Sequence, residues 1–175
     1  MPMPAKRAVA PKGSVTSGPR YWLMKTEPES FSFADLMQAP KRTTGWDGVR
    51  NYQARNFMRD EMQSGDQVFI YHSSAEPPGV AGIAEIAGPA RPDASAFDAK
   101  DSHYDPGSKR EAPTWVMVDV RGIEPLERFV SLDELRANPA LAGMRLLQRG
   151  NRLSIVPVTA GEWREIRSMA KKRPR

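Results

Sequence analysis

The sequence predicts an α+β fold, a mixed β-barrel of about five strands with short flanking helices. Short apolar runs typical of strands recur along the chain, without the regular strand–helix–strand alternation of a doubly wound sheet. No internal repeat period is present. Residues 79–90 form an apolar run that contains Gly82 and Gly88, as expected where a strand bends around the corner of a barrel.

The first half of the domain predicts two strands and two helices. Residues 21–25 (YWLMK) form an apolar run that predicts the first strand. Residues 32–38 predict a short helix, because a serine and an aspartate three residues later can form a capping box. Residues 51–61 predict a second helix with a loose apolar stripe. Residues 66–73 (DQVFIYHS) are apolar on both faces, which predicts an interior strand of the barrel.

The second half predicts further strands, two helices and one long loop. Residues 91–114 are loop-like in composition. Residues 115–126 (WVMVDVRGIEPL) predict a long strand with three valines on one face. Residues 131–137 and 159–169 each begin with a capping-box pattern and predict helices. Residues 153–158 (LSIVPV) predict the last strand, which lies between those two helices in the sequence.

Length and composition favour one folded domain between two basic tails. We expect a disordered basic leader at residues 1–20, the domain at 21–170 and a basic tail at 171–175. The 175 residues include no cysteine, so we expect a cytoplasmic protein, in the cytosol or nucleoid of a bacterium if the source is bacterial. No apolar run reaches the length of a membrane span, so we expect no membrane partner. We also expect a monomer.

The net charge of +5 is concentrated in the two tails. Residues 1–20 and residues 171–175 each carry four basic side chains and no acidic one. Residues 21–170 carry 18 basic and 21 acidic side chains, so the domain itself is mildly acidic. A protein that binds nucleic acid chiefly by neutralising phosphates is expected to carry its basic excess on the fold. Any selectivity is therefore expected to come from a local pocket.

Four stretches of the sequence together resemble the EVE domain family. They are YWLMKTEPESFS (21–32), GWDGVRNYQARNFMR (45–59), VFIYHS (68–73) and LLQRGNRLSIVPV (146–158), and the intervening HYDPGSKREAPTWVMVDV is similar as well. The resemblance extends over nearly the whole domain, from about residue 21 to residue 169. It implies a PUA-like barrel related to the YTH and ASCH domains. It also implies a nucleic-acid partner, DNA or RNA, that carries a modified base such as methylated or oxidised cytosine.

A protein that reads a flipped base needs stacking aromatics and a few fixed donors and acceptors. Trp46 lies in a glycine-flanked loop, where a large aromatic is harder to explain as core, so we place it in the pocket wall. Pro28 restrains Glu27 toward an extended conformation, which can present Glu27 to a ligand edge. The candidate base-binding residues are Trp22, Lys25, Thr26, Glu27, Pro28, Trp46, Asp47, Val49, Arg50, Asn51, Tyr71, His72, Ser73, Trp115, Gln148 and Arg149.

Several candidates have an ordinary structural alternative. Trp22 lies inside a strand, where core packing is the competing explanation. Asn51 can simply cap the helix that follows it. His72 can be a satisfied structural histidine. Residues 26–28 can form an exposed turn, and the turn that carries Gln148 and Arg149 can be a solvated loop.

We expect a non-catalytic reader that uses no cofactor and no metal. The first alternative is an enzyme acting on a modified base or nucleotide, for which Glu27, His72 and Ser73 are the acid, base and nucleophile candidates. The sequence contains no P-loop, nucleophile elbow or zinc-deaminase motif, and its two histidines lie far apart. The second alternative is a small-molecule or protein-interaction module, which the mildly acidic domain supports.

Overall fold

A computed structural model of the chain describes residues 20–172. Apart from Arg20, Lys171 and Lys172, the leader and the tail that the sequence predicts lie outside the described residues. Between residues 20 and 172, no helix combines the length and the apolar character that crossing a membrane requires.

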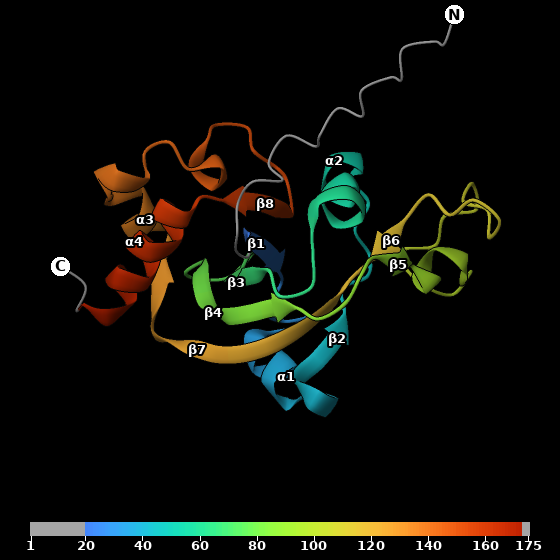
Figure 1. The fold of residues 1–175 in the computed structure, drawn as a ribbon, viewed down its shortest axis with the longest axis horizontal. Coiled ribbons are helices and arrows are strands. Elements are labelled where there is room, and N and C mark those ends of the chain that lie inside the picture. Colours follow the sequence, from blue (N-terminus) through green and yellow to red (C-terminus); the bar gives the residue numbers. More distant parts are fainter. Residues whose placement is uncertain (1–19, 173–175) are drawn as a thin grey trace, which may run out of the picture.

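A curled, six-stranded mixed sheet forms the centre of the fold (Figure 1). Its strand order is β2–β7–β4–β3–β1–β8, in which β1 and β3 are parallel and the other neighbours are antiparallel. The strands are β1 (Tyr21–Thr26), β2 (Thr43–Gly45), β3 (Gln67–His72), β4 (Gly79–Ile86), β7 (Asp119–Ser131) and β8 (Ile155–Val158). Two short strands, β5 (Arg91–Pro92) and β6 (Val116–Met117), form a separate ribbon at one end.

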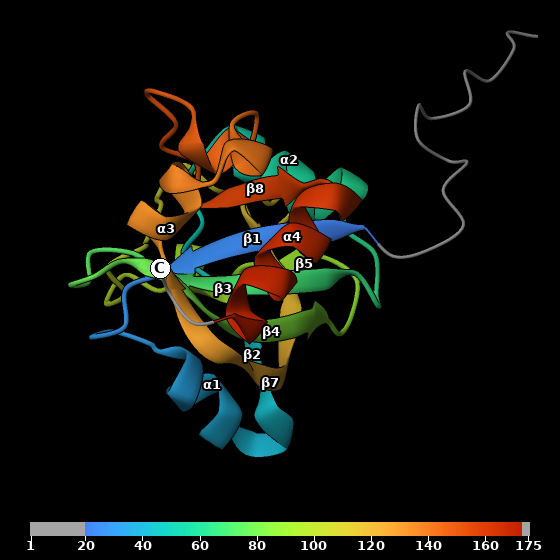
Figure 2. The ribbon, with the colours of Figure 1, turned by 90° about the vertical axis from the view of Figure 1, so that its left-hand side faces the viewer.

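Helices cover both faces of this sheet (Figure 2). The α-helices are α1 (Phe33–Gln38), α2 (Tyr52–Asn56), α3 (Leu132–Ala137) and α4 (Ala160–Lys171). A π-helical turn, Phe57–Glu61, continues α2. Four 3-10 turns lie in the connections, at Pro40–Arg42, Ala94–Phe97, Pro139–Leu141 and Arg145–Leu147.

Each α-helix begins at a side chain that caps it, and the sequence predicts a capping box for three of the four. Ser32, Ser131 and Thr159 form complete capping boxes with the acidic residue three positions later. Asn51 caps α2, because its Oδ1 accepts a hydrogen bond of 3.0 Å from the backbone N–H of Ala54. Such caps typically contribute about 1 kcal/mol each. The structure therefore confirms the alternative in which Asn51 caps the helix that follows it.

Alternate side chains of the central strands pack into two apolar clusters, one on each face of the sheet. In β3, Val68 and Ile70 belong to the cluster beneath α1 and α2, whereas Phe69 and Tyr71 belong to the cluster beneath α3 and α4. Trp163 of α4 stacks on Phe69, with 3.8 Å between the ring centroids. Both faces of the sheet are thus buried, which explains why residues 66–73 are apolar without alternation.

Gly82 allows α1 to pack directly on the curled sheet. A Cβ at this position would overlap the ring of Phe33, the first residue of α1. The register between β3 and β4 also shifts next to Gly82, between Ile70 and Tyr71 on the partner strand. The prediction that this glycine marks a bend is therefore supported by a bulge and by the close approach of a helix.

The predicted α+β fold class is confirmed, and five of the predicted strands correspond to β1, β3, β4, β7 and β8. Other details are wrong. The predicted strand 115–126 is interrupted at Val118 and continues to Ser131, and β4 ends at Ile86 rather than at residue 90. The predicted loop 91–114 contains β5 and a 3-10 turn. Strands of two or three residues, such as β2, β5 and β6, are too short to show a periodicity.

Candidate functional site

A cavity of about 570 Å³ opens at the carboxyl ends of β1 and β3, which lie side by side because these strands are parallel. The backbone N–H of Ser73 donates to the carbonyl oxygen of Thr26 at 2.9 Å, and that of Lys25 donates to Ser154 at 2.8 Å. The volume is typical of small-ligand sites. The lining residues are Lys25, Thr26, Glu27, Ser30, Phe31, Thr44, Gly45, Trp46, Asp47, Gly48, Ser73, His103, Arg152 and Ser154.

Trp46 forms the aromatic wall of this cavity. Its backbone N–H donates to the carbonyl oxygen of Val118 at 2.8 Å, which continues the pairing of β2 with β7. Its ring meets that of Phe31 edge to face, with 6.5 Å between the centroids. Trp46 also belongs to the apolar cluster beneath α1 and α2, and only 8% of its surface is exposed. The expectation that Trp46 lies outside the core is therefore wrong, because one indole serves both the cluster and the cavity.

Asp93 anchors the loop that carries Trp46 and Asp47. Its side chain is fully buried and accepts hydrogen bonds from the backbone N–H of Gly48 at 2.9 Å and from Arg50 Nη1 at 3.0 Å. Burial raises the pKa of Asp93, but hydrogen bonds from Ser95, Gly48 and Arg50 outweigh it and hold the pKa below its usual range. Asp93 is thus a fixed negative charge behind the cavity.

Gly48 is needed in this loop for two reasons. Its φ of +76° lies in the left-handed region, a backbone conformation that residues with a side chain rarely adopt. A Cβ would also come within 2.7–2.9 Å of the imidazole ring of His103. The glycine therefore lets His103, from the segment between β5 and β6, close over the loop and line the cavity.

Two ionisable side chains at the cavity have altered pKa values. Burial raises the pKa of Asp47, and the negative charges of Asp93 and Asp101 raise it further, while His103 acts in the opposite direction. Burial lowers the pKa of Lys25. Among the described residues, neither side chain forms an ion pair. The cavity therefore offers an acceptor and a donor beside an aromatic wall, as a flat ligand with a polar edge requires.

The structure brings together only part of the predicted set. Six predicted residues line the cavity, namely Lys25, Thr26, Glu27, Trp46, Asp47 and Ser73. Asn51, Gln148 and Arg149 line a second cavity of about 430 Å³. Arg152 lines both cavities, so the two adjoin each other. Pro28 lines neither of them.

Four other candidates are structural. Trp22 is 2% exposed in the core, where its Nε1 donates to Asp66 Oδ2 at 3.0 Å. Val49 is buried in the same apolar cluster, and Tyr71 lies in the cluster on the opposite face of the sheet. His72 Nε2 accepts a hydrogen bond of 3.0 Å from the backbone N–H of Phe33, and burial lowers its pKa. Neighbouring residues of a strand point to opposite faces, so β1 and β3 present only some of the predicted side chains to the cavity.

Arg50 and Trp115 hold the segment between β5 and β6 in place. Arg50 donates to Asp93 and to the carbonyl oxygen of His103. The Nε1 of Trp115 donates to Asp105 Oδ2 at 2.7 Å, and its ring stacks on Tyr52 with 5.0 Å between the centroids. Arg50 and Trp115 therefore stabilise the segment that carries His103, but neither side chain lines the cavity.

Sequence reasoning missed several residues that line the cavity or anchor its loop. Arg152 and Ser154 lie in a stretch that resembles the EVE family, so that resemblance contained a signal for them. His103 also lies in a similar stretch, but only the fold shows that it closes over Gly48. Asp93 has no local signal, because its importance depends on contacts with Gly48 and Arg50.

Within residues 20–172, no group of three or more His, Asp or Glu side chains is arranged to hold a metal ion.

Comparison with known proteins places these features in a family context. A family model described as the EVE domain matches residues 20–169. Thymocyte nuclear protein 1 of the rat is 46% identical over 171 residues, which cover 88% of this chain and 75% of the relative.

Solved structures are similar over the same region. The human THYN1 protein, in complex with DNA that contains 5-methylcytosine, is 44% identical with a TM-score of 0.84, and the match covers 89% of this chain and 99% of that chain. A protein from Pseudomonas syringae is 41% identical with a TM-score of 0.81, and the match covers 86% of this chain and 99% of that chain.

Proposed function

This chain belongs to the EVE domain family, and we propose that it is a non-catalytic reader that binds a modified cytosine of DNA in the cavity of about 570 Å³. The base would leave the duplex stack to enter the cavity, as other flipped bases do. The observation that carries the proposal is the cavity itself, which combines the indole of Trp46 with Lys25 and Asp47. The similarity to a protein solved with 5-methylcytosine-containing DNA supports it.

The lining suits the chemistry of a cytosine. The base has apolar faces, an exocyclic amino group that donates hydrogen bonds, and ring and carbonyl acceptors along one edge. Trp46 and Phe31 offer apolar contact, the carboxylate of Asp47 can accept from the amino group, and Lys25 can donate to an acceptor. A duplex base has no access to such a set, because its faces are stacked on its neighbours.

The positions of the polar side chains support binding rather than catalysis. Glu27 and Ser73 line the cavity, but His72 does not, and its Nε2 is engaged by the backbone N–H of Phe33. A nucleophile needs a base within hydrogen-bond reach, and the proposed enzyme alternative assigned that role to His72. We further propose that the protein acts as a monomer in the cytoplasm, to which the absence of cysteine lends support.

The proposal is tested by titrating the full-length protein with matched oligonucleotides that differ at one cytosine. Duplex DNA with 5-methylcytosine, the same duplex with cytosine, and RNA strands with either base are compared by fluorescence anisotropy. We expect tighter binding to the methylated DNA, because only the modified base has the extra apolar group to bury. Equal affinity for all four probes would refute the reader function, and a preference confined to RNA would reassign the partner.

Asp47 is predicted to make the affinity for methylated DNA depend on pH. Since its pKa is raised, Asp47 becomes protonated at a higher pH than an ordinary carboxyl group as the solution is acidified. The affinity for methylated DNA should fall over that interval, and Asp47→Ala should weaken it by about tenfold or more at neutral pH. Asp47→Asn keeps an acceptor oxygen and should remove the acid-side decline.

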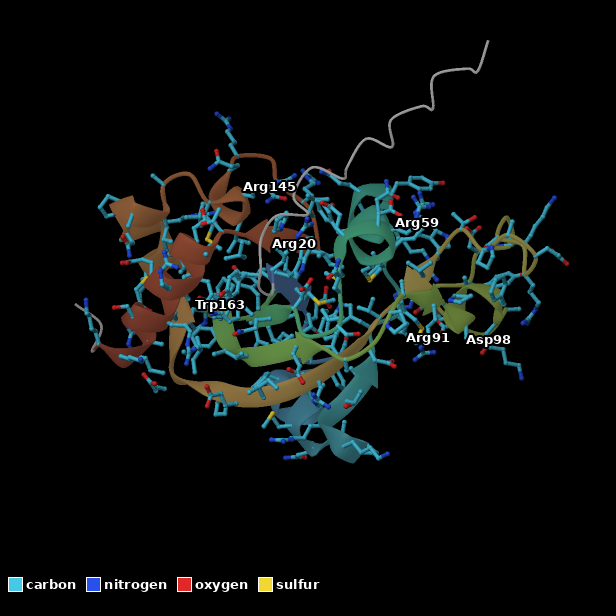
Figure 3. All side chains as sticks on the ribbon, viewed as in Figure 1. Arg20, Arg59, Arg91, Asp98, Arg145 and Trp163 are labelled. Carbon is cyan, nitrogen blue, oxygen red and sulfur yellow. The ribbon has the colours of Figure 1, made fainter. Side chains whose placement is uncertain are left out.

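Two variants serve as controls for this prediction. Asp98→Ala removes an exposed carboxylate that lies on the segment between β5 and β6 but does not line the cavity, and it should behave as wild type (Figure 3). His103→Gln removes the imidazole that lowers the pKa of Asp47, so an acid decline that persists in this variant and moves to higher pH assigns the titration to the carboxyl group. An acid decline that persists in Asp47→Asn would contradict the assignment.

A further inference from the structure

The second cavity is an arginine groove, which we define by Arg145, Arg149 and Arg152 on the segment ahead of β8 and by Asn51 and Gln53 of the facing α2 region. Its volume is about 430 Å³, and none of its lining residues is acidic. Figure 3 shows Arg145 at the top of the view, on the side of the molecule where this segment and α2 lie. Arg152 joins the groove to the cavity described above.

The charge of this groove contrasts with that of the domain. Residues 21–170 carry more acidic than basic side chains, yet residues 143–154 (GMRLLQRGNRLS) contain three arginines and no acid. Among the ion pairs of the described residues, none involves Arg145, Arg149 or Arg152. Three arginines without an acidic partner therefore gather on one face of a domain that is otherwise mildly acidic.

The segment that carries these arginines is held in a defined shape. Gln148 Nε2 donates to the carbonyl oxygen of Met144 at 3.0 Å, and the backbone N–H of Leu153 donates to Asn151 Oδ1 at 2.9 Å. Gly150 makes the turn with a φ of +80°. The arginines are thus presented by an ordered loop, which reduces the entropy that is lost when they bind a ligand.

We propose that the arginine groove binds the phosphodiester backbone of the DNA strand whose modified base occupies the adjoining cavity. Guanidinium groups bind phosphate oxygens with two parallel hydrogen bonds, and the amides of Asn51 and Gln53 can add neutral donors to the backbone. Arg152 lies at the junction and contacts the phosphate nearest the flipped base. Arg145 and Arg149 contact the phosphates farther along the same strand.

This inference rests on the proposed function and explains how a mildly acidic domain can hold DNA. The groove positions the strand without reading its sequence, and the cavity supplies the selectivity. The two contributions predict different signatures. Loss of the groove should weaken binding to methylated and unmethylated duplexes by the same factor, whereas loss of the cavity should change their ratio.

The test is the salt dependence of binding to both duplexes by the full-length double variant Arg145→Gln/Arg149→Gln. Each phosphate contact that is lost should reduce the slope of log K against log salt by about 0.9, so the double variant should lose about 1.8. The ratio of affinities for the two duplexes should stay at its wild-type value. Because the ring of Phe57 lies 5.6 Å from Arg145, a melting curve verifies that the variant is folded.

The matched control is Arg110→Gln/Arg164→Gln, which removes the same charge from two exposed arginines outside the groove. Its salt slope should stay close to that of wild type. An equal loss of slope in both double variants, or an unchanged slope in the groove variant, would overturn the inference. The slope is also measurable with unmethylated DNA, so a wild-type protein without base preference would refute the reader function and still leave the groove tested.

Discussion

Trp46→Ala is expected to lower both the stability of the protein and its preference for the modified base. Trp46 is 8% exposed within an apolar cluster, and truncating such a tryptophan typically costs about 3–5 kcal/mol. Removing the aromatic wall should also reduce the affinity for methylated DNA by about five- to a hundredfold, since stacking a base on an aromatic ring contributes about 1–3 kcal/mol. Thermal melting and anisotropy titrations on the same preparation measure the two effects.

Trp163→Ala separates the two effects. Trp163 is 3% exposed and stacks on Phe69 in the cluster on the opposite face of the sheet, away from the cavity. This variant should lose a comparable amount of stability but keep the wild-type ratio of affinities when it is assayed well below its melting temperature. If Trp46→Ala kept that ratio too, or if both variants lost it, Trp46 would not be the wall of the base site.

Asp93→Ala is expected to cause a large loss of stability. The side chain of Asp93 is fully buried and pairs with Arg50, and removing one partner of a buried ion pair typically costs about 3–5 kcal/mol. The melting temperature should fall by roughly 6–20 °C, at about 2–4 °C per kcal/mol for a domain of this size. Because the loop with Trp46 and Asp47 loses its anchor at Gly48, base binding should weaken as well.

The pH dependence of stability gives a second readout for Asp93. Its pKa is lowered in the folded state, so its stabilising effect is present above about pH 4 and is lost as the pH falls through the folded-state value. Asp93→Ala should therefore lose less stability than wild type on acidification. Asp60→Ala is the control for the loss of stability in Asp93→Ala. Asp60 Oδ1 lies 2.8 Å from Arg59 Nε in an exposed ion pair, so this variant should leave the melting temperature nearly unchanged. Similar melting shifts in the two variants would contradict the anchoring role.

The sequence was sufficient where local chemistry decides the structure. Capping boxes at Ser32, Ser131 and Thr159 predicted three helices, and apolar runs predicted the long strands of the sheet. The motif resemblance predicted family membership, which the match over residues 20–169 confirms. These features depend on residues close together in the chain, so one sequence contains the whole signal.

Prediction was weaker where the site depends on contacts that are distant in the sequence. Trp22 and Trp46 were both assigned to the pocket, but only the fold shows that Trp22 faces Asp66 in the core. The role of Asp93 depends on a loop more than forty positions earlier in the chain. Arg149 was predicted as a base contact, whereas the structure places it in the groove beside the cavity. Strand direction and loop packing determine such placements, and neither can be read from local spacing.

The most direct test of the central claim is an NMR measurement of a duplex with a ¹³C-labelled methyl group on one 5-methylcytosine. At saturation with the full-length protein, we expect nuclear Overhauser contacts between that methylated ring and the indole protons of Trp46, and loss of its contacts to the neighbouring stacked bases. Trp163 should show no contact, because it lies in the cluster on the other face of the sheet. A methylated base that keeps its contacts within the duplex, with none to Trp46, would contradict the account.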